Sequence, residues 1–262
     1  MSRQGWRCVL IAAAVLIATC GTAIAQKLGI VLLHGKEAPG DSMQPLARLL
    51  SAAGYAVEVP EMCWSKRRIY DLPYLECMRD VDAAVERLKK RGASEVVILG
   101  QSLGGNFAIG YGAHRQGLKG IIVTAGGHHP AGIISTFPEI SAAWQRARQL
   151  VTDGKGDAPR LKFPDNNDTG LFFVSATPKA YLSWYDIDGP ANMQNSVRKL
   201  TAPLLWVSGD ADPLQKLVGS VFIRAAKHPL NRHMTIKATH RGTPVASRDT
   251  VLAWLKELTN QQ

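Results

Sequence analysis

The sequence lacks the features that mark disordered, repetitive or nucleic-acid-binding chains. Its 262 residues contain no long run of like charges, no low-complexity tract and no internal repeat, so the composition is that of a globular protein. No basic stripe interleaved with aromatic residues occurs either, and we therefore expect no nucleic-acid partner. The length is enough for one α/β domain with a sizeable core.

Long apolar runs are also scarce, and the one at the N-terminus, residues 9–18, is too short to predict a membrane span. Arg3 and Arg7 precede this run, and Ala23-Ile24-Ala25 follows it with the small-x-small pattern that signal peptidase accepts. We therefore expect residues 1–25 to be a signal peptide, and the protein to be exported, periplasmic or secreted, with no stable membrane span after cleavage. The remaining domain would cover residues 26–262.

Cysteine is rare, and two of the four cysteines, Cys8 and Cys20, lie in the predicted signal peptide. Lipoprotein processing at Cys20 is the alternative to cleavage after Ala25, but Thr19 is a poor residue before a lipidated cysteine. Cys63 and Cys77 remain, and in an oxidising compartment they are expected to form a disulfide, worth about 3 kcal/mol by loop entropy. A metal or redox pair is the rival interpretation; the spacing is not CxxC and no histidine is near.

Apolar runs of strand length alternate with stretches of helical periodicity along the chain. Leu28–Leu33 is continuously apolar and ends at His34-Gly35, which is typical of a buried parallel strand. Further strands are expected at 55–59, 95–99, 120–124, 203–208 and 233–237, with helices near 43–53, 75–91, 104–114, 217–223 and 251–258. This alternation predicts a parallel sheet of about six strands with helices on both faces.

The interval from about 127 to 199 breaks the alternation. It contains an amphipathic helix near 140–151 and then a Gly-, Asp-, Pro- and Asn-rich stretch, 153–169. An insertion of this size between strands is usually functional, so we expect a cap over the C-terminal edge of the sheet; a surface excursion unrelated to any site is the alternative. Four aromatic residues suggest that the cap lines an apolar pocket, unless they pack a core of its own: Phe172, Phe173, Tyr181 and Trp184.

The segment Gly100-Gln101-Ser102-Leu103-Gly104 is a GxSxG motif between a predicted strand and a predicted helix. A turn this tight needs glycine or another small residue on both sides, and it forces the serine into a strained conformation with its hydroxyl exposed. The backbone N–H of Leu103, at the helix N-terminus, could then stabilise an oxyanion. An incidental glycine-rich turn is the alternative, but the apolar strand before it and Gly105 after it favour a nucleophile elbow.

A serine nucleophile requires a base to take its proton and an acid to orient that base. His240 follows a late strand on a loop and is our candidate base, whereas three other histidines lie near a helix end or begin a strand: His114, His228 and His233. Asp210 and Asp212 follow the strand at 203–208, and both are candidates for the acid.

The chain resembles the α/β-hydrolase superfamily over essentially all of the sequence after residue 25. Four signals, in this order, carry the resemblance: the His34-Gly35 turn, the GxSxG motif, Gly209-x-x-Asp212 and His240. The resemblance implies the α/β-hydrolase fold. It favours Asp212 over Asp210 as the acid, and it implies that the backbone N–H of Lys36 joins that of Leu103 in an oxyanion hole. His34 would then be structural.

Two departures from the superfamily pattern bear on the site. The antiparallel strands that often precede the His-Gly strand are not found, so the sheet should be small. Lys36 stands where an apolar residue is common, and its side chain could be directed either to substrate or to solvent.

His128 and His129 follow a strand at the edge of the site, and they could be either substrate contacts or loop residues. The loop carrying Trp64, Arg67 and Arg68 is expected to be a solvated basic loop overlooking the pocket.

The resemblance implies a serine hydrolase that cleaves a small-molecule carboxylic ester through an acyl-serine intermediate, as carboxylesterases and lipases do. Ser102, His240 and Asp212 would carry this chemistry with no cofactor and no metal. An acyltransferase, or an amidase or peptidase, could use the same triad. A non-catalytic binding protein with the hydrolase fold is the alternative from a different class, because fold alone does not fix activity.

Overall fold

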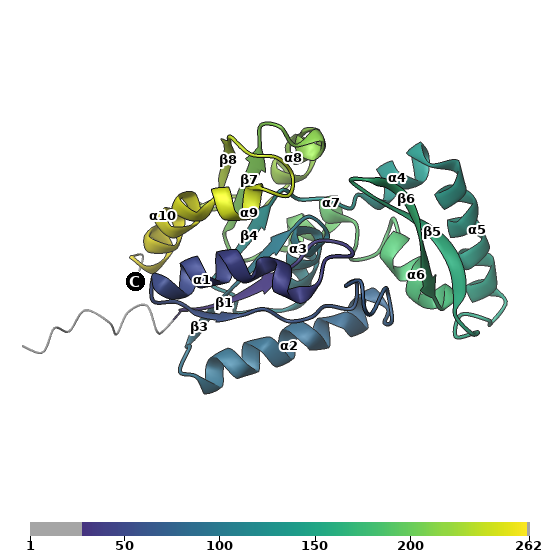
Figure 1. The fold of residues 1–262 in the computed structure, drawn as a ribbon, viewed down its shortest axis with the longest axis horizontal. Coiled ribbons are helices and arrows are strands. Elements are labelled where there is room, and N and C mark those ends of the chain that lie inside the picture. The colour runs from purple at the N-terminus through teal and green to yellow at the C-terminus, as the bar shows by residue number, and fades with distance from the viewer. Residues whose placement is uncertain (1–27, 261–262) are drawn as a thin grey trace, which may run out of the picture.

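The computed structural model of the protein describes residues 28–260 (Figure 1), so the predicted signal peptide lies outside the described residues. A six-stranded sheet with the order β2-β1-β3-β4-β7-β8 forms its centre, and all its neighbouring strands are parallel. Its strands are β1 (Leu28–Leu33), β2 (Ala56–Glu58), β3 (Glu95–Gln101), β4 (Gly120–Thr124), β7 (Leu204–Gly209) and β8 (Arg232–Ile236). The predicted sheet of about six parallel strands is confirmed.

The central strands are continuously apolar because helices cover both faces of the sheet. On one face, Val31 and Leu33 of β1 pack in the same cluster as residues of α2 (Tyr74–Lys90) and α3 (Leu103–His114). On the other face, Ile30 and Leu32 pack with residues of α1 (Gln44–Ala52) and α10 (Arg248–Thr259). The part of the chain after β7 also contains two short helices, α8 (Leu217–Phe222) before β8 and α9 (Thr243–Ala246) before α10.

Most of an insertion between β4 and β7 stands to one side of the six-stranded sheet, whereas its last helix, α7 (Met193–Ser196), lies against α3 (Figure 1). The insertion consists of α4 (Pro130–Thr136), α5 (Pro138–Thr152), the antiparallel pair β5 (Leu161–Asn167) and β6 (Gly170–Ala176), α6 (Pro178–Tyr185) and α7. Strand β5 lies within the Gly-, Asp-, Pro- and Asn-rich stretch 153–169, for which we predicted no strand. Pro164 and the Asp-Asn-Asn run after it have low strand propensity; pairing with β6 makes this segment a strand.

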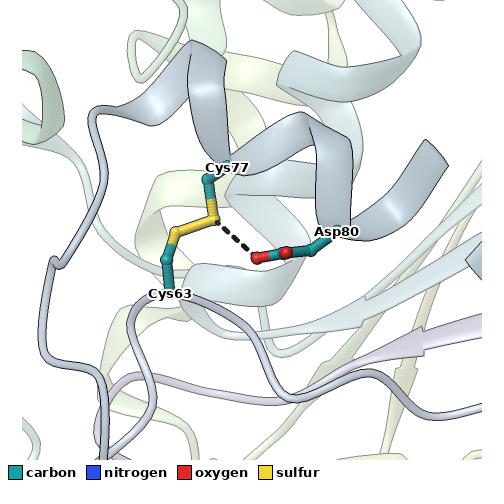
Figure 2. Close-up of side chains that lie close together, drawn as sticks. All are labelled: Cys63, Cys77 and Asp80. Carbon is teal, nitrogen blue, oxygen red and sulfur yellow. Dashed lines mark hydrogen bonds between the residues drawn. A yellow bond between two sulfur atoms is a disulfide. The ribbon is translucent and has the colours of Figure 1, made fainter. Parts of the chain in front are cut away.

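The disulfide between Cys63 and Cys77 is present, as predicted, with 6.1 Å between the two Cα atoms. It joins a loop to the first turn of α2, as Figure 2 shows, and Sγ of Cys77 lies 3.9 Å from the Asp80 carboxylate. These three residues have the spatial grouping of metal ligands. The sulfur atoms are bonded to each other, however, so they are not available as the thiolates that bind metals.

The loop at 63–70 is solvated and basic at Lys66 and Arg67, which are exposed, but not at Trp64. Trp64 is buried, and its ring packs against those of Phe107 and Trp184. Arg68 donates hydrogen bonds to the carboxylates of Asp71 and Asp80 at 2.8 and 2.7 Å. The expectation therefore holds for Lys66 and Arg67 and was wrong for Trp64, which belongs to the core. Among the described residues, no helix has both the length and the apolar character needed to cross a membrane.

Candidate active site

Ser102 lies between β3 and α3 with φ 55° and ψ −118°, a backbone conformation that a residue with a side chain rarely adopts. The glycines on either side of it make this turn possible. A Cβ atom on Gly104 would lie 2.5 Å from the carbonyl oxygen of Leu33, and one on Gly100 would overlap the backbone of Gly104. The expected strained elbow is therefore present, and it is packed directly against the end of β1.

The three residues selected from the sequence as nucleophile, base and acid meet at the carboxyl ends of the strands. His240 Nε2 lies 2.9 Å from Ser102 Oγ, and His240 Nδ1 lies 2.9 Å from Asp212 Oδ2. The side chains of Asp212 and His240 are buried. Asp212 is itself held in place, because its Oδ1 accepts a hydrogen bond from the backbone N–H of Leu214 at 2.9 Å. These contacts allow a proton to pass from the serine to an imidazole that a carboxylate orients.

The rival candidates have other partners. Asp210 accepts a hydrogen bond from the backbone N–H of Ala238 at 3.1 Å and does not contact the imidazole of His240. The imidazoles of the other three histidines lie against neighbouring protein groups: His114 against the Gly110 carbonyl, His228 against the Leu230 N–H and His233 against the Ser208 hydroxyl. The structure thus separates Asp212 from Asp210, which sequence spacing alone had left open.

The two backbone amides proposed for the oxyanion hole border the same cavity as Ser102. Leu103 is the first residue of α3, where a backbone N–H has no acceptor inside the helix. Lys36 follows Gly35, on which a Cβ atom would lie 3.5 Å from the Ser102 Cβ. Within residues 28–260, neither the Leu103 nor the Lys36 amide has a protein acceptor. Both N–H groups are therefore available to a ligand.

His34 organises the turn that carries Lys36. Its Nε2 accepts a hydrogen bond from the Met62 backbone N–H at 3.1 Å, and its carbonyl oxygen accepts one from Trp64 Nε1 at 2.9 Å. Burial lowers the pKa of the His34 imidazole, which keeps it neutral and able to accept. Because the disulfide of Cys63 lies between these two partners, the bridged loop and the turn after β1 are fixed to each other.

The cavity at Ser102 and His240 has a volume of about 590 Å³. Its wall combines apolar residues with charged residues, among them Leu214, Ile133, Lys66 and Arg241. None of the four aromatic residues that we expected to line it does so: Phe172, Phe173, Tyr181 and Trp184. Instead, Tyr181 stacks on Phe163 within the insertion and Trp184 packs against Trp64 and Phe107. Phe173 is 58 % exposed.

His128 and His129 have different surroundings. The imidazole of His128 is buried beside the cavity and its Nε2 lies 2.7 Å from the Trp184 carbonyl oxygen, so Nε2 carries the proton. Burial, with a smaller contribution from the Lys36 charge, lowers the pKa of His128 to about 3. His129 caps α4, because its Nδ1 accepts a hydrogen bond from the Gly132 N–H at 3.0 Å.

The side chain of Lys36 is directed neither to solvent nor to the centre of the cavity. Its Nζ donates a hydrogen bond to Asp165 of β5 at 2.6 Å, and the Lys36 and Asp165 side chains are 8 % and 0 % exposed. Sequence reasoning missed Asp165, because it lies in a polar stretch for which no strand was predicted and 129 residues from its partner. An isolated carboxylate in a polar stretch gives no signal that it will be buried.

The comparisons with known proteins agree with this fold. A metagenome-derived lipolytic enzyme has a TM-score of 0.61 at 17% sequence identity, covering 90% of this chain and 94% of its own. The monoacylglycerol lipase from Paleococcus ferrophilus has 0.62 at 20% identity, covering 89% and 94%. A thermophilic esterase from Thermogutta terrifontis has 0.58 at 18% identity, covering 88% and 90%. At these identities, the likeness shows the fold alone.

A search of curated protein sequences found no match. The sequence model of the alpha/beta hydrolase family, in contrast, matches residues 30–253, which include the turn after β1, the GxSxG elbow and the loops that carry Asp212 and His240. Since this match spans most of the chain and the sheet has the expected topology, the protein belongs to the alpha/beta hydrolase family.

Proposed function

We propose that the protein is a serine hydrolase that cleaves small-molecule carboxylic esters through an acyl-serine intermediate. The observation that carries this proposal is the pair of 2.9 Å contacts that connect Ser102, His240 and Asp212. A serine in a nucleophile elbow, a histidine on its hydroxyl and a buried carboxylate behind the histidine are together the parts that acyl transfer requires. The names of similar structures, a monoacylglycerol lipase and an esterase among them, support the choice of an ester.

In the proposed mechanism, His240 Nε2 takes the proton of Ser102 as Oγ attacks the ester carbonyl carbon. Asp212 stabilises the imidazolium that forms, and the N–H groups of Leu103 and Lys36 stabilise the negative charge on the carbonyl oxygen. The C–O bond to the alcohol then breaks, and His240 gives its proton to the leaving oxygen. A water molecule, deprotonated by His240, attacks the acyl-serine in the second half of the reaction, which releases the acid and restores the serine.

Hydrolysis of p-nitrophenyl acetate and butyrate tests the proposal. Wild-type protein is expected to release p-nitrophenol, and Ser102→Ala and His240→Ala are expected to lower kcat by at least about 10³-fold. Ser42→Ala is the matched control, because Ser42 also borders the cavity but does not contact His240. Wild-type activity no higher than that of Ser102→Ala would refute the proposal.

We also propose that the protein is exported after removal of residues 1–25, and that the insertion is a cap over the site. The disulfide supports an oxidising compartment, and Asn166, Asn167 and Asp168 of the hairpin border the same cavity as Ser102. Intact mass of the protein recovered from the periplasm or medium should correspond to a chain beginning at Gln26. A chain that keeps residues 1–25 would contradict export by cleavage.

A further inference from the structure

A buried carboxylate connects the insertion to the turn that carries the Lys36 amide. Asp165 Oδ1 accepts hydrogen bonds from Lys36 Nζ at 2.6 Å and from the Tyr185 hydroxyl, and its Oδ2 accepts one from the Tyr70 hydroxyl at 2.8 Å. The Asn166 backbone N–H donates to Oδ1 as well, at 2.7 Å. Asp165 is thus a fully buried carboxylate with four donors around it.

The four donors of Asp165 come from four separate segments of the chain. Lys36 follows β1, Tyr70 lies in the loop closed by the disulfide, Tyr185 ends α6, and Asn166 is in β5. Lys36 Nζ makes a second hydrogen bond to the Asn166 carbonyl oxygen at 3.0 Å. The Lys36 ammonium therefore has its counter-charge and its second acceptor on the hairpin, and both ends of this link are out of solvent.

The turn that carries Lys36 needs such a restraint. Glu37, the next residue, has φ 56°, a conformation that costs a residue with a side chain free energy and persists only where its surroundings hold it. Two contacts hold Glu37 itself: its backbone N–H donates to the Trp64 carbonyl at 3.1 Å and its carboxylate accepts from Asn167 Nδ2 at 2.8 Å. The Lys36 side chain supplies the corresponding restraint one residue earlier.

We propose that Asp165 is a positioning residue for ester hydrolysis: through the Lys36 ammonium, it holds the Lys36 backbone N–H where the oxyanion forms. Asp165 acts through Lys36 and touches no reacting atom. The inference rests on the proposed function, since it assigns a role to Asp165 only if the Lys36 amide stabilises an oxyanion. It gives the insertion a part in catalysis that is separate from covering the site.

Replacing Asp165 by Asn keeps the shape of the side chain and leaves a buried ammonium without a counter-charge. Such a charge is costly, and Lys36 can relieve the cost by turning toward the cavity, which it borders, carrying its backbone N–H with it. An oxyanion donor acts on the transition state more than on the bound ester. We therefore expect Asp165→Asn to lower kcat by about 10- to 100-fold and to change KM by less than about 2-fold.

The test combines Asp165→Asn with Lys36→Met, which retains the backbone N–H of residue 36 but removes the ammonium. Rates are measured per active site titrated with a fluorophosphonate. Because Asp165 acts through the ammonium, Asp165→Asn should lower kcat by about 10- to 100-fold in the wild type. In the Lys36→Met background it should lower kcat by less than about 3-fold. Lys36→Met alone should lower kcat by about 5-fold at unchanged KM, since the turn loses its tether.

Asp82→Asn is the matched control. Asp82 likewise accepts hydrogen bonds from a tyrosine hydroxyl and a cation, Tyr111 at 2.8 Å and Arg115 at 2.8 Å, but these residues do not border the cavity. It should lower the melting temperature and leave kcat per titrated site unchanged. The side chain of Asp82 is 37 % exposed and that of Asp165 is 0 % exposed, so a purely structural Asp165 would lower the melting temperature further than Asp82 but would likewise leave kcat per titrated site unchanged.

Two results would overturn the inference without contradicting the proposed hydrolase function. One is an equal fall in kcat on Asp165→Asn in the wild type and in the Lys36→Met background; the other is an unchanged kcat in both single variants. If Asp165→Asn does not fold, Lys36→Met decides: a kcat equal to that of the wild type overturns the inference. Failure of the proposed function looks different, because the wild type itself would then neither hydrolyse esters nor react with the fluorophosphonate, and the inference would fall with it.

Discussion

Arg241, the residue after His240, holds Asp168 at the tip of the β5–β6 hairpin through two hydrogen bonds, from Nε at 2.6 Å and from Nη2 at 2.8 Å. Both residues border the cavity. The loop that carries the candidate base is therefore connected to the insertion at the mouth of the site. Unlike the buried pair of Lys36 and Asp165, this pair is in contact with solvent, because the Arg241 side chain is 69 % exposed.

Arg241→Gln should weaken substrate binding without disabling the chemistry. Exposed ion pairs contribute about 0–1 kcal/mol, so the free energy of unfolding should change by less than about 1 kcal/mol. Loosening the hairpin tip should raise KM by about 2- to 5-fold at nearly constant kcat, because the bound ester and the transition state would lose the same binding interaction. Steady-state kinetics on p-nitrophenyl butyrate measure this, with Arg67→Gln, which removes an exposed pair with Glu61 away from His240, as the control. A fall in kcat above about 10-fold would show that Arg241 acts on catalysis.

Asp212 and Asp210 provide a matched pair, two residues apart on one loop. Asp212→Asn should lower kcat by about 10⁴-fold, because an amide cannot hold the imidazole in the correct tautomer or stabilise its charged form. Asp210→Asn should leave kcat within about 3-fold and change the free energy of unfolding by less than about 1 kcal/mol, because the asparagine oxygen can still accept from the Ala238 N–H. Comparable losses of kcat in both variants would contradict the assignment of the acid.

The cavity should favour short acyl chains over long ones. Lys66, Asp168 and Arg241 border it, and none of the expected insertion aromatics does. A longer chain therefore gains less than the usual ~0.8 kcal/mol per buried methylene. In a series of p-nitrophenyl esters, kcat/KM should be highest for acetate to butyrate and should fall toward the dodecanoate. Phe173 is exposed and does not border the cavity, so Phe173→Ala should leave this profile unchanged. A steady rise of kcat/KM with chain length would contradict the predicted preference.

Burial of neutral His128 should make the fold sensitive to acid. Its pKa is about 3 in the folded protein against 6.5 when exposed, so between these values the unfolded chain binds the additional proton and stability falls as pH is lowered. His128→Asn suits the positive φ of this position and removes the titration. From pH 7 to pH 5, the wild type should lose about 2 kcal/mol more than the variant in urea unfolding. Equal losses would show that His128 does not contribute.

The parts of the fold and of the site that depend on local signals were predictable from the sequence. The apolar run of β1 is buried on both faces, and the Ser102 elbow needs only its glycines, a strand and a helix. His240 and Asp212 were identified because each follows a strand that ends at the same edge of the sheet. His233 was set aside because it begins a predicted strand, whereas the choice of Asp212 over Asp210 required either family resemblance or the structure.

Features that depend on pairing between distant segments were not predictable. Strand β5 contains Pro164 and Asn166, which have low strand propensity, and it forms because it pairs with β6, so its own residues did not predict it. The position of the Lys36 ammonium depends on its hydrogen bond to Asp165, which lies far along the chain, and no periodic pattern in the sequence connects the two residues. Trp64 was placed on a solvated loop for the same reason, since its burial depends on Phe107 and Trp184.

The most direct test of the central claim is the position of the covalent adduct. Protein treated with a fluorophosphonate should gain the mass of one phosphonyl group, and peptide sequencing by mass spectrometry should place it on Ser102. Ser102→Ala should gain none, whereas Ser42→Ala should react as the wild type does. An adduct on another residue, or its persistence in Ser102→Ala, would contradict the assignment of Ser102 as the nucleophile.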